Sequence, residues 1–322
     1  MKFKDLSQEV QIERIASLAR ETCKKYFGDI TSLELINYEF NATFKVQSGG
    51  QAFALRLNIN STRTRENAFA EVALVRFLGQ HTEIRVPQVR LTLNGEAVTL
   101  VKIDGIEHPL PAVMYSWLEG NEVGDEPSES QLSALGAAMA KMHDAAVDFA
   151  LPTGSDLPTF DDFFWGTEDF LFSPLSQLSP EVSDQLQTAR YAIDDIVLEL
   201  YQRDGKRVIH ADLHGWNLMW QNNILGIFDF DDCGFGLPVQ DLATALYYLD
   251  TPEQDAALIK GYRSFRDLPE YSEREMKALL LHRRILLLNY LYETSKKEHQ
   301  ALLPEYLPET LRRVEEFLEN KF

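Results

Sequence analysis

The chain has 322 residues, of which 45% are apolar and 25% are charged, and its formal charge at pH 7 is −19. This length and composition are typical of a folded protein with two lobes or domains, and they exclude a fibrous or largely disordered chain. The large negative charge opposes binding to nucleic acid or to anionic lipid, and it favours a cationic partner.

The cysteines and the terminal segment bear on the cellular compartment. Cys23 and Cys233 are far apart and match no metal-ligand spacing, so they indicate neither a disulfide scaffold nor a zinc site. The N-terminal residues lack the apolar segment of a signal peptide, and the most apolar helical stretch is interrupted by His282, Arg283 and Arg284. We therefore expect a soluble, cytoplasmic protein with no membrane or nucleic-acid partner.

The first 120 residues combine helices with several strands. Apolar residues at helical spacing predict an amphipathic helix over residues 7–27 and a second helix over 65–81. Short runs rich in Val, Ile, Leu and Phe predict strands. Three of them, with Gly49 and Gly50 in a turn, form an antiparallel meander. The predicted strands cover residues 33–40, 42–48, 51–59, 86–93, 96–103 and 111–118.

The remaining residues are mostly helical. A polar turn over residues 119–130 places a lobe boundary near Gly120, which gives lobes of residues 1–119 and 120–322. Ser128 and Gln131 form a capping-box pattern that begins a helix. A long helix over 179–203, two short strand-like pieces at 207–213 and 224–230, and two or three final helices complete the expected order.

Polar residues gather in the stretch VIHADLHGWNLMW, residues 208–220, and ILGIFDFDD follows soon after. Asp212 and Asn217 lie on a loop after one short strand, and Asp229 is presented by the next strand. Carboxylate and amide oxygens suit Mg²⁺, which keeps several waters and usually also binds substrate phosphates. We expect the three side chains to face one another across a site.

These motifs resemble those of the aminoglycoside phosphotransferase and choline kinase-like family, which includes homoserine kinase-type and stress-response kinase-type members. The resemblance rests on HADLHGWNLMW, on IFDFDD, on GLPVQDLA directly after it, and on a β-rich half followed by a helical half. It implies an α+β, two-lobed protein kinase-like fold, with a β-rich N-lobe that binds nucleotide, a mainly helical C-lobe for catalysis and substrate, and an active site in the cleft between them.

The resemblance also implies roles for the motif residues. Asp212 is similar to the catalytic-loop carboxylate that accepts the proton of the substrate hydroxyl, and Asn217 and Asp229 are similar to the Mg²⁺ ligands. His210 and Asp241 resemble residues that brace the catalytic loop. His214 is expected to be a solvated or supporting residue.

A basic residue for the nucleotide phosphates is implied on the third strand. Arg56, in FALRLN, stands where protein kinases have Lys, and its planar guanidinium can donate two parallel hydrogen bonds to a phosphate. Its carboxylate partner is expected on the following helix, at Glu71 or, as the alternative, at Glu66.

Two further segments resemble nucleotide-binding parts of the family by their position. Asn41 and Thr43 lie in a small polar turn where the family covers the nucleotide. Backbone groups near Ser116 and Leu118 resemble the hinge that pairs with adenine.

The stretch PTFDDFFWGTEDFLF, residues 158–172, mixes aromatic with acidic side chains. It predicts either a pocket for an amine-bearing molecule or a helix-packing surface with a solvated acidic face.

The sequence therefore predicts a kinase that uses ATP and Mg²⁺ and phosphorylates a hydroxyl group of a small, amine-bearing and cationic molecule, similar to an aminoglycoside, an amino alcohol or homoserine. The choice between ATP and GTP stays open. A Ser/Thr protein kinase of the stress-response type is the alternative enzyme. A catalytically silent nucleotide-binding scaffold is a third possibility, which the presence of Asp212, Asn217 and Asp229 disfavours.

Overall fold

The computed structural model describes residues 2–61, 63–174, 176–294 and 296–320. The chain divides into two compact units, and each is described by itself. Unit 1 comprises Met1–Glu122, Asp148–Leu157 and Leu218–Asp231, and unit 2 comprises Val123–Val147, Pro158–Asn217 and Asp232–Phe322. The predicted single boundary near Gly120 does not account for the two later segments, Asp148–Leu157 and Leu218–Asp231, which also belong to unit 1. The assignment of residues 1–119 and 120–322 as functional lobes stays a prediction.

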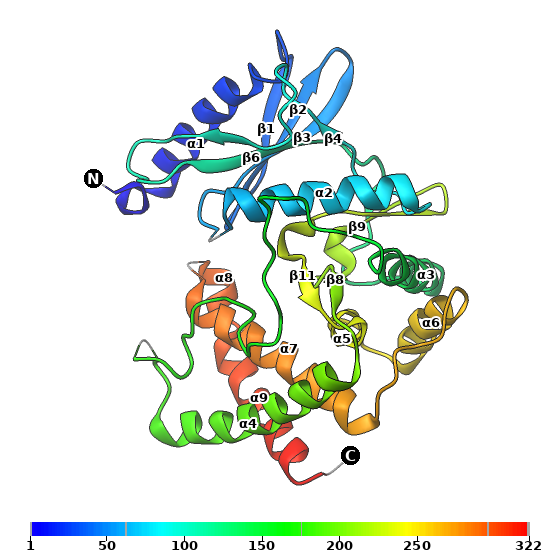
Figure 1. Ribbon diagram of the computed structural model, residues 1–322. Helices are drawn as coiled ribbons and strands as arrows, with labels where there is room; N and C mark the ends of the chain where they lie inside the picture. Colours follow the sequence, from blue (N-terminus) through cyan, green and yellow to red (C-terminus); the bar gives the residue numbers. More distant parts are fainter. Residues whose placement is uncertain (1, 62, 175, 295, 321–322) are drawn as a thin grey trace. The chain divides into compact units, whose positions relative to one another are not determined.

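Unit 1 is built on a six-stranded antiparallel sheet with the order β1-β2-β3-β6-β4, in which β5 also pairs with β6 (Figure 1). The predicted meander is confirmed, because β1 pairs with β2 and β2 pairs with β3. Gly49 and Gly50 connect β2 to β3 with φ angles of 57° and 76°, which glycine adopts without steric cost. The strands are β1 (Ser32–Tyr38), β2 (Ala42–Ser48), β3 (Gln51–Leu57), β4 (Val89–Arg90), β5 (Thr99–Val101) and β6 (Leu110–Ser116).

The two faces of this sheet carry different side chains, because successive residues of a strand point to opposite faces. Phe44, Leu55 and Met114 share one buried apolar cluster with residues of α1 (Gln8–Cys23). Arg56, next to Leu55, points to the other face and contacts α2 (Arg65–His81). The apolar face therefore holds the sheet to α1, while the other face is left for polar contacts. Burying each large apolar side chain contributes about 1.5–3 kcal/mol.

Three details of unit 1 differ from the predictions. The strand expected over residues 86–93 is reduced to β4, two residues long, next to Pro87, whose nitrogen cannot donate a ladder hydrogen bond. The first helix ends at Cys23, before residue 27. Residues Asn121–Glu122, in the predicted turn, form β7, which joins a three-stranded sheet with β9 (Leu218–Gln221) and β10 (Ile224–Ile227).

Unit 2 is mainly helical, with one two-stranded sheet of β8 (Arg207–Ile209) and β11 (Gly234–Gly236) (Figure 1). The predicted capping box is present, since Ser128 N donates to Gln131 Oε1 at 2.8 Å and Gln131 N donates to Ser128 Oγ at 3.4 Å. The helices are α3 (Glu129–Ala145), α4 (Pro180–Arg203), α5 (Pro238–Tyr247), α6 (Pro252–Arg263), α7 (Glu273–Glu293), α8 (Lys297–Gln300) and α9 (Leu303–Leu318). Across both units, short 3₁₀ helices lie at Phe3–Asp5, Gly215–Asn217 and Phe230–Asp232.

Helices α3 and α6 touch through their backbones. A Cβ atom at Gly136 of α3 would overlap the carbonyl oxygen of Leu258, and one at Gly261 of α6 would overlap the carbonyl oxygen of Ser133. Glycine is therefore required at both positions for this close approach.

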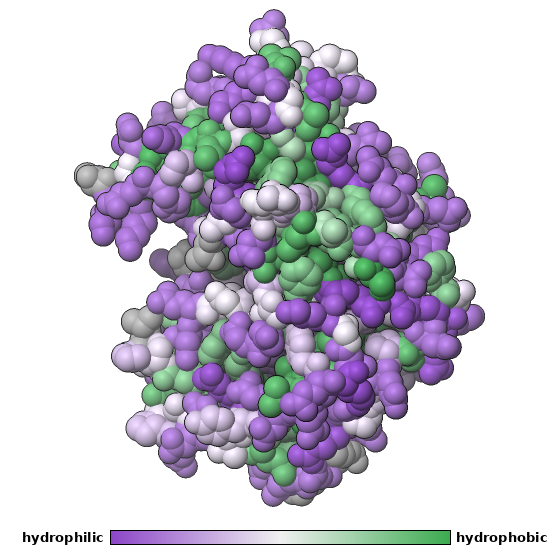
Figure 2. Space-filling view, viewed as in Figure 1, coloured by the Kyte–Doolittle hydropathy of each residue, from purple (hydrophilic) through white to green (hydrophobic). Residues whose placement is uncertain are grey.

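Polar side chains cover most of the face seen in Figure 2, with apolar residues in scattered patches. This distribution agrees with a charged fraction of 25% and a net charge of −19. Within the part of the chain that the structure describes, no helix combines the length and the apolar character needed to cross a membrane.

Candidate active site

The loop that follows β8 carries Asp212 and is held by the carboxylate of Asp241. Ala211 has a φ of 69°, a left-handed conformation that costs free energy for a residue with a Cβ atom. Asp241, at the start of α5, accepts hydrogen bonds from Ala211 N at 2.8 Å and from His210 N at 3.3 Å. The bracing contact predicted for Asp241 is therefore present, and it offsets the cost of the strained backbone.

A buried histidine supports Asp241 in turn. His143 Nε2 lies 2.9 Å from Asp241 Oδ2, and His143 Nδ1 lies 2.9 Å from the hydroxyl of Tyr262. Burial alone would raise the pKa of Asp241, but the hydrogen bond and charge of His143 outweigh it and lower that pKa. His210 also contacts the loop backbone, because its Nδ1 accepts from Asp212 N at 3.3 Å.

Three side chains hold the carboxylate of Asp212. Arg283 Nη2 donates to Oδ1, while His214 Nε2 lies 3.2 Å and Asn217 Nδ2 lies 3.0 Å from Oδ2. The same Arg283 nitrogen donates to Tyr248 Oη at 2.8 Å. Burial would raise the pKa of Asp212, but the charge of Arg283 and the contacts of His214 outweigh it and hold that pKa well below its ordinary value. Asp212 is therefore ionised and fixed in orientation at neutral pH.

Arg283 was not assigned to the site from the sequence, although it stood out as part of a basic triplet in an apolar helix. It belongs to α7 and lies 71 residues from Asp212 in the sequence. Its pKa is held above the ordinary arginine value, because Tyr248 and Asp212 outweigh the effect of burial.

Asn217 is positioned by its amide nitrogen, which donates to the backbone oxygen of Asp212 at 2.8 Å as well as to its carboxylate. Two residues earlier, Gly215 lies against the backbone of Gly124, and a Cβ atom at Gly215 would overlap the Gly124 carbonyl oxygen. Because the nitrogen of the Asn217 amide is committed to Asp212, the amide oxygen is directed elsewhere and can serve as a hard ligand for a metal ion.

In unit 1, Arg56 and Glu71 form the ion pair predicted from the sequence. Arg56 Nη1 donates to Glu71 Oε1 at 2.9 Å, and Arg56 Nη2 donates to Glu71 Oε2. Tyr115 Oη donates to the same carboxylate at 2.8 Å. Glu66, the alternative partner, is exposed near the start of α2.

A second carboxylate, Asp231, also contacts Arg56 and was not singled out in the sequence. Its Oδ1 lies 3.4 Å from Arg56 Nη2, and it accepts hydrogen bonds from Asn41 Nδ2 at 2.6 Å and from Asn58 Nδ2 at 3.3 Å. Burial would lower the pKa of Arg56, but Asp231 and Glu71 outweigh it and hold that pKa well above its ordinary value. Arg56 Nε is buried and has no hydrogen-bond partner among the described residues.

Asp229 follows β10 with a φ of 60°, and its side chain is 46% exposed. Its Oδ1 lies 3.8 Å from Arg56 Nη1. Asn217 in unit 2 and Asp229 in unit 1 each carry an oxygen of the kind that Mg²⁺ prefers, and their binding of a metal ion stays a prediction. Within the described ranges, no group of three or more His, Cys, Asp or Glu side chains could hold a metal ion.

Some of the residues predicted to contact the nucleotide lie in the sheet of unit 1, where backbone groups form hydrogen bonds with neighbouring strands. Ser116 N donates to Gln88 O at 2.7 Å, so that group is not free to pair with a nucleotide base. Leu118 lies beyond the end of β6, and Thr43 lies in β2 opposite Arg56. The nucleotide contacts of Asn41, Thr43, Leu118 and the other backbone groups near Ser116 stay predictions.

The aromatic and acidic stretch at residues 158–172 is a packing element. Phe163 and Phe164 are buried, and the guanidinium of Arg190 lies 5.3–5.5 Å from the rings of these two residues and Phe172. Asp169 accepts hydrogen bonds from the backbone of Leu171 and Phe172. The rings therefore pack in the interior of unit 2, as the second interpretation of this stretch predicted.

Comparison with known proteins agrees with these features. Residues 36–276 match the model of the phosphotransferase enzyme family. Amicoumacin kinase of Bacillus subtilis (strain 168) is 27% identical over 212 residues, which are 64% of this chain and 60% of that protein. The matched region thus spans less than two thirds of that kinase.

Two solved structures resemble the fold over nearly the whole chain. A microcompartment-associated aminopropanol kinase has a TM-score of 0.79 and 23% identity, with coverage of 94% of this chain and 98% of that chain. The amicoumacin kinase hAmiN, in complex with AMP-PNP, Ca²⁺ and Ami, has a TM-score of 0.76, 19% identity and 96% coverage of both chains. The fold is therefore that of the kinase-like phosphotransferases, as predicted. The chain belongs to the phosphotransferase enzyme family.

Proposed function

We propose that this protein is an ATP-dependent kinase that transfers the γ-phosphoryl group to a hydroxyl group of a small, amine-bearing molecule. The observation that carries the proposal is the carboxylate of Asp212, which is ionised, oriented by three side chains and presented on a loop braced by Asp241. Membership of the phosphotransferase enzyme family supports the same reaction class.

Asp212 would orient the acceptor hydroxyl and take its proton. As the acceptor oxygen bonds to the γ-phosphorus, the bond from that phosphorus to the leaving oxygen of ADP breaks, and the hydroxyl proton passes to the Asp212 carboxylate. A carboxylate with a depressed pKa is a weak base toward an alcohol. Its main contribution is therefore orientation, and the proton moves after the new bond has begun to form.

Arg56 would contact the nucleotide phosphates, with its guanidinium oriented by Glu71 and Asp231. Four further residues are proposed to contact the nucleotide: Asn41 in the β1–β2 connection, Thr43 in β2, and the backbone near Ser116 at the end of β6 and Leu118 beyond it. We also propose that Asn217 and Asp229 bind Mg²⁺, which would neutralise charge on the phosphates when bound. ATP analogues occur in a structurally similar kinase, and this supports ATP as the donor.

The acceptor class rests on related proteins and on charge. Relatives act, by their names, on amicoumacin and aminopropanol, both small molecules. The −19 charge of the chain favours an acceptor with an amine. Arg283 lies directly beside Asp212 and would favour an acceptor that also carries a carboxylate, such as a hydroxy amino acid, over a simple amino alcohol.

A transfer assay tests the proposal. The full chain, ATP and Mg²⁺ are incubated with amino alcohols, aminoglycosides, hydroxy amino acids and generic protein substrates, and phosphate uptake is measured for each, with the Asp212→Asn variant as the control. Transfer to one of the amine-bearing molecules, lost in the variant, is the expected result. Transfer to protein substrates alone would favour a Ser/Thr protein kinase. Nucleotide binding without transfer or hydrolysis would favour a scaffold.

A further inference from the structure

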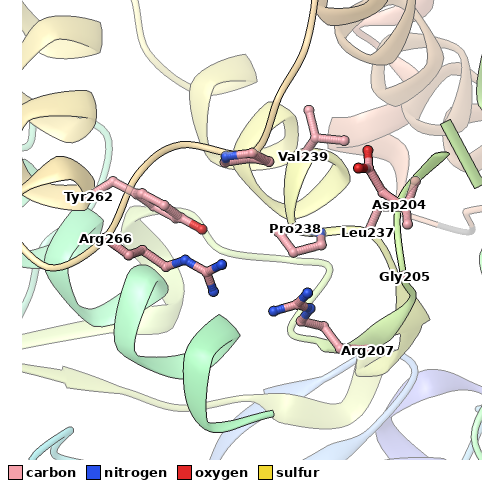
Figure 3. Close-up of a pocket in the computed structure, with 9 residues that line it drawn as sticks. Asp204, Gly205, Arg207, Leu237, Pro238, Val239, Tyr262 and Arg266 are labelled. Carbon is pink, nitrogen blue, oxygen red and sulfur yellow. The ribbon is translucent and has the colours of Figure 1, made fainter. Parts of the chain in front are cut away.

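A small cavity in unit 2 is lined by none of the residues assigned to catalysis, and its volume is about 140 Å³. Its walls come from the residues after α4, from β8, from the start of α5 and from the end of α6 and the segment that follows. Figure 3 shows the side chains of Arg207 and Arg266 extending toward each other from opposite walls.

Among the described residues, the two guanidinium groups have no carboxylate within hydrogen-bond distance. Arg207 Nη1 donates to the backbone oxygen of His143 at 2.9 Å, and the ion pair of Arg266 with Asp144 is long, at 3.9 Å. Arg207 Nε and Arg266 Nη1 are both buried and have no hydrogen-bond partner among the described residues. Burial and the charge of Arg266 both lower the pKa of Arg207, as expected when two like charges lie close together.

Acidic groups near the cavity compensate this positive charge only in part, since Asp144 and Asp204 raise the pKa of Arg207 less than burial and Arg266 lower it. Asp204 also lines the cavity, but its carboxylate is engaged by Arg203 Nη2 at 3.4 Å. The first residues of α5, Pro238 and Val239, form another wall, and the N-terminus of a helix adds positive potential.

We propose that this cavity binds a phosphoryl group, either as inorganic phosphate or as the phosphorylated end of a small molecule. Guanidinium groups match the geometry of phosphate oxygens and donate charge-assisted hydrogen bonds to them. The cavity is smaller than the roughly 300–1,000 Å³ of pockets that enclose whole drug-sized ligands, so it suits one phosphoryl group with any remaining part of the molecule outside.

The cavity shares contacts with the support of the catalytic loop. Arg207 binds the backbone of His143, and Tyr262, which lines the cavity, binds the His143 ring at 2.9 Å. The same ring contacts Asp241, which holds the backbone of Ala211. A phosphoryl group in the cavity would therefore lie beside Arg207 and Tyr262, two residues that contact His143.

Calorimetric titration of the full chain with inorganic phosphate and with glycerol 3-phosphate tests the proposal. The protein is first saturated with AMP-PNP, so that the phosphate-binding Arg56 is already occupied. Arg266→Gln is the main variant, because Arg266 makes weaker contacts within the chain than Arg207, and Arg207→Gln is the second. Arg263→Gln is the matched control, since Arg263 is an exposed arginine of α6 that does not line the cavity.

We expect Arg266→Gln and Arg207→Gln to weaken phosphate binding by about tenfold or more, and Arg263→Gln to leave it unchanged. The ligand that binds more tightly identifies the source of the phosphoryl group. In phosphate-free buffer, Arg266→Gln should not lower the Tm, because it removes the repulsion between the Arg207 and Arg266 guanidinium groups. Added phosphate should no longer raise the Tm of this variant. Equal binding by Arg266→Gln and Arg263→Gln, or no phosphate-dependent heat or Tm change in the wild type, would overturn the proposal.

Discussion

Replacing Arg283 with Met removes the cation that holds Asp212 and should change both stability and pH dependence. The side chains of Arg283 and Asp212 are 12% and 22% exposed. Removing one partner of a buried ion pair costs about 3–5 kcal/mol. Because Asp212 keeps His214 and Asn217 as partners, we expect the free energy of unfolding at pH 7 to fall by about 2–3 kcal/mol.

The direction of the pH effect follows from the depressed pKa of Asp212. A carboxylate with a lowered pKa in the folded state stabilises the protein above its unfolded pKa of about 4, and this contribution is lost as the pH falls through the folded value. Arg283→Met raises the folded pKa, so the stability difference from the wild type should be largest at neutral pH and shrink below pH of about 4. The acidic limb of kcat/KM should also move to higher pH in the variant.

Urea denaturation between pH 3 and 7 and a pH profile of kcat/KM measure the two effects. Arg283→Lys keeps the charge and should retain part of both. Arg284→Met is a matched control, because Arg284 is also buried in α7 but donates to Thr310 Oγ1 at 2.9 Å and to Tyr306 O at 3.2 Å. It should lose stability without moving the acidic limb. An Arg283→Met protein with wild-type stability at pH 7 and an unmoved acidic limb would refute the reasoning.

Five other variants test further predictions. Asp212→Asn should lower kcat by about 10²- to 10⁴-fold with nearly unchanged nucleotide affinity, and steady-state kinetics with a near wild-type kcat would contradict a role in orienting the hydroxyl. Asp229→Ala and Asn217→Ala should raise the Mg²⁺ concentration needed for turnover, with the larger effect for the Asp229 carboxylate; an unaltered Mg²⁺ titration of Asp229→Ala would argue against metal binding. Arg56→Ala should raise the KM for ATP by about tenfold or more, and an unchanged KM would move the phosphate contact elsewhere. Burial lowers the pKa of His282 to about 4, so the free energy of unfolding should fall as the pH drops from about 6.5 to 4, and His282→Gln should weaken that dependence in denaturation experiments; an identical pH dependence would refute it.

Local sequence patterns predicted those helices and strands whose formation depends on residues close together in the sequence. The β1–β3 meander follows from alternating apolar residues and the Gly49–Gly50 turn, and α3 begins at the predicted capping box. Strand β7 could not be predicted in this way. Asn121 and Glu122 are polar residues in a turn-like segment, and they form a strand only because they pair with Trp220 and Met219, about a hundred residues later.

In the candidate site, too, local sequence patterns identified some residues but not the contacts between segments far apart in the sequence. Motif spacing indicated Asp212, Asn217 and Asp229, whose roles stay predictions. Helix position indicated Glu71 as the partner of Arg56, and the structure contains that ion pair. The contacts of Asp212 with Arg283 and of Arg56 with Asp231 join segments far apart in the sequence. No short-range pattern specifies such pairs, because each depends on how whole helices and strands pack.

The glycine contact between α3 and α6 limits how the support of the catalytic loop can vary during evolution. Helix α3 carries His143 and helix α6 carries Tyr262, and the backbones of the two helices touch at Gly136 and Gly261. A spacing set by main-chain atoms cannot adjust through side-chain rotamers. Exposed side chains on the two helices can therefore change without moving His143, whereas a single methyl group added at either glycine would shift a histidine that contacts Asp241.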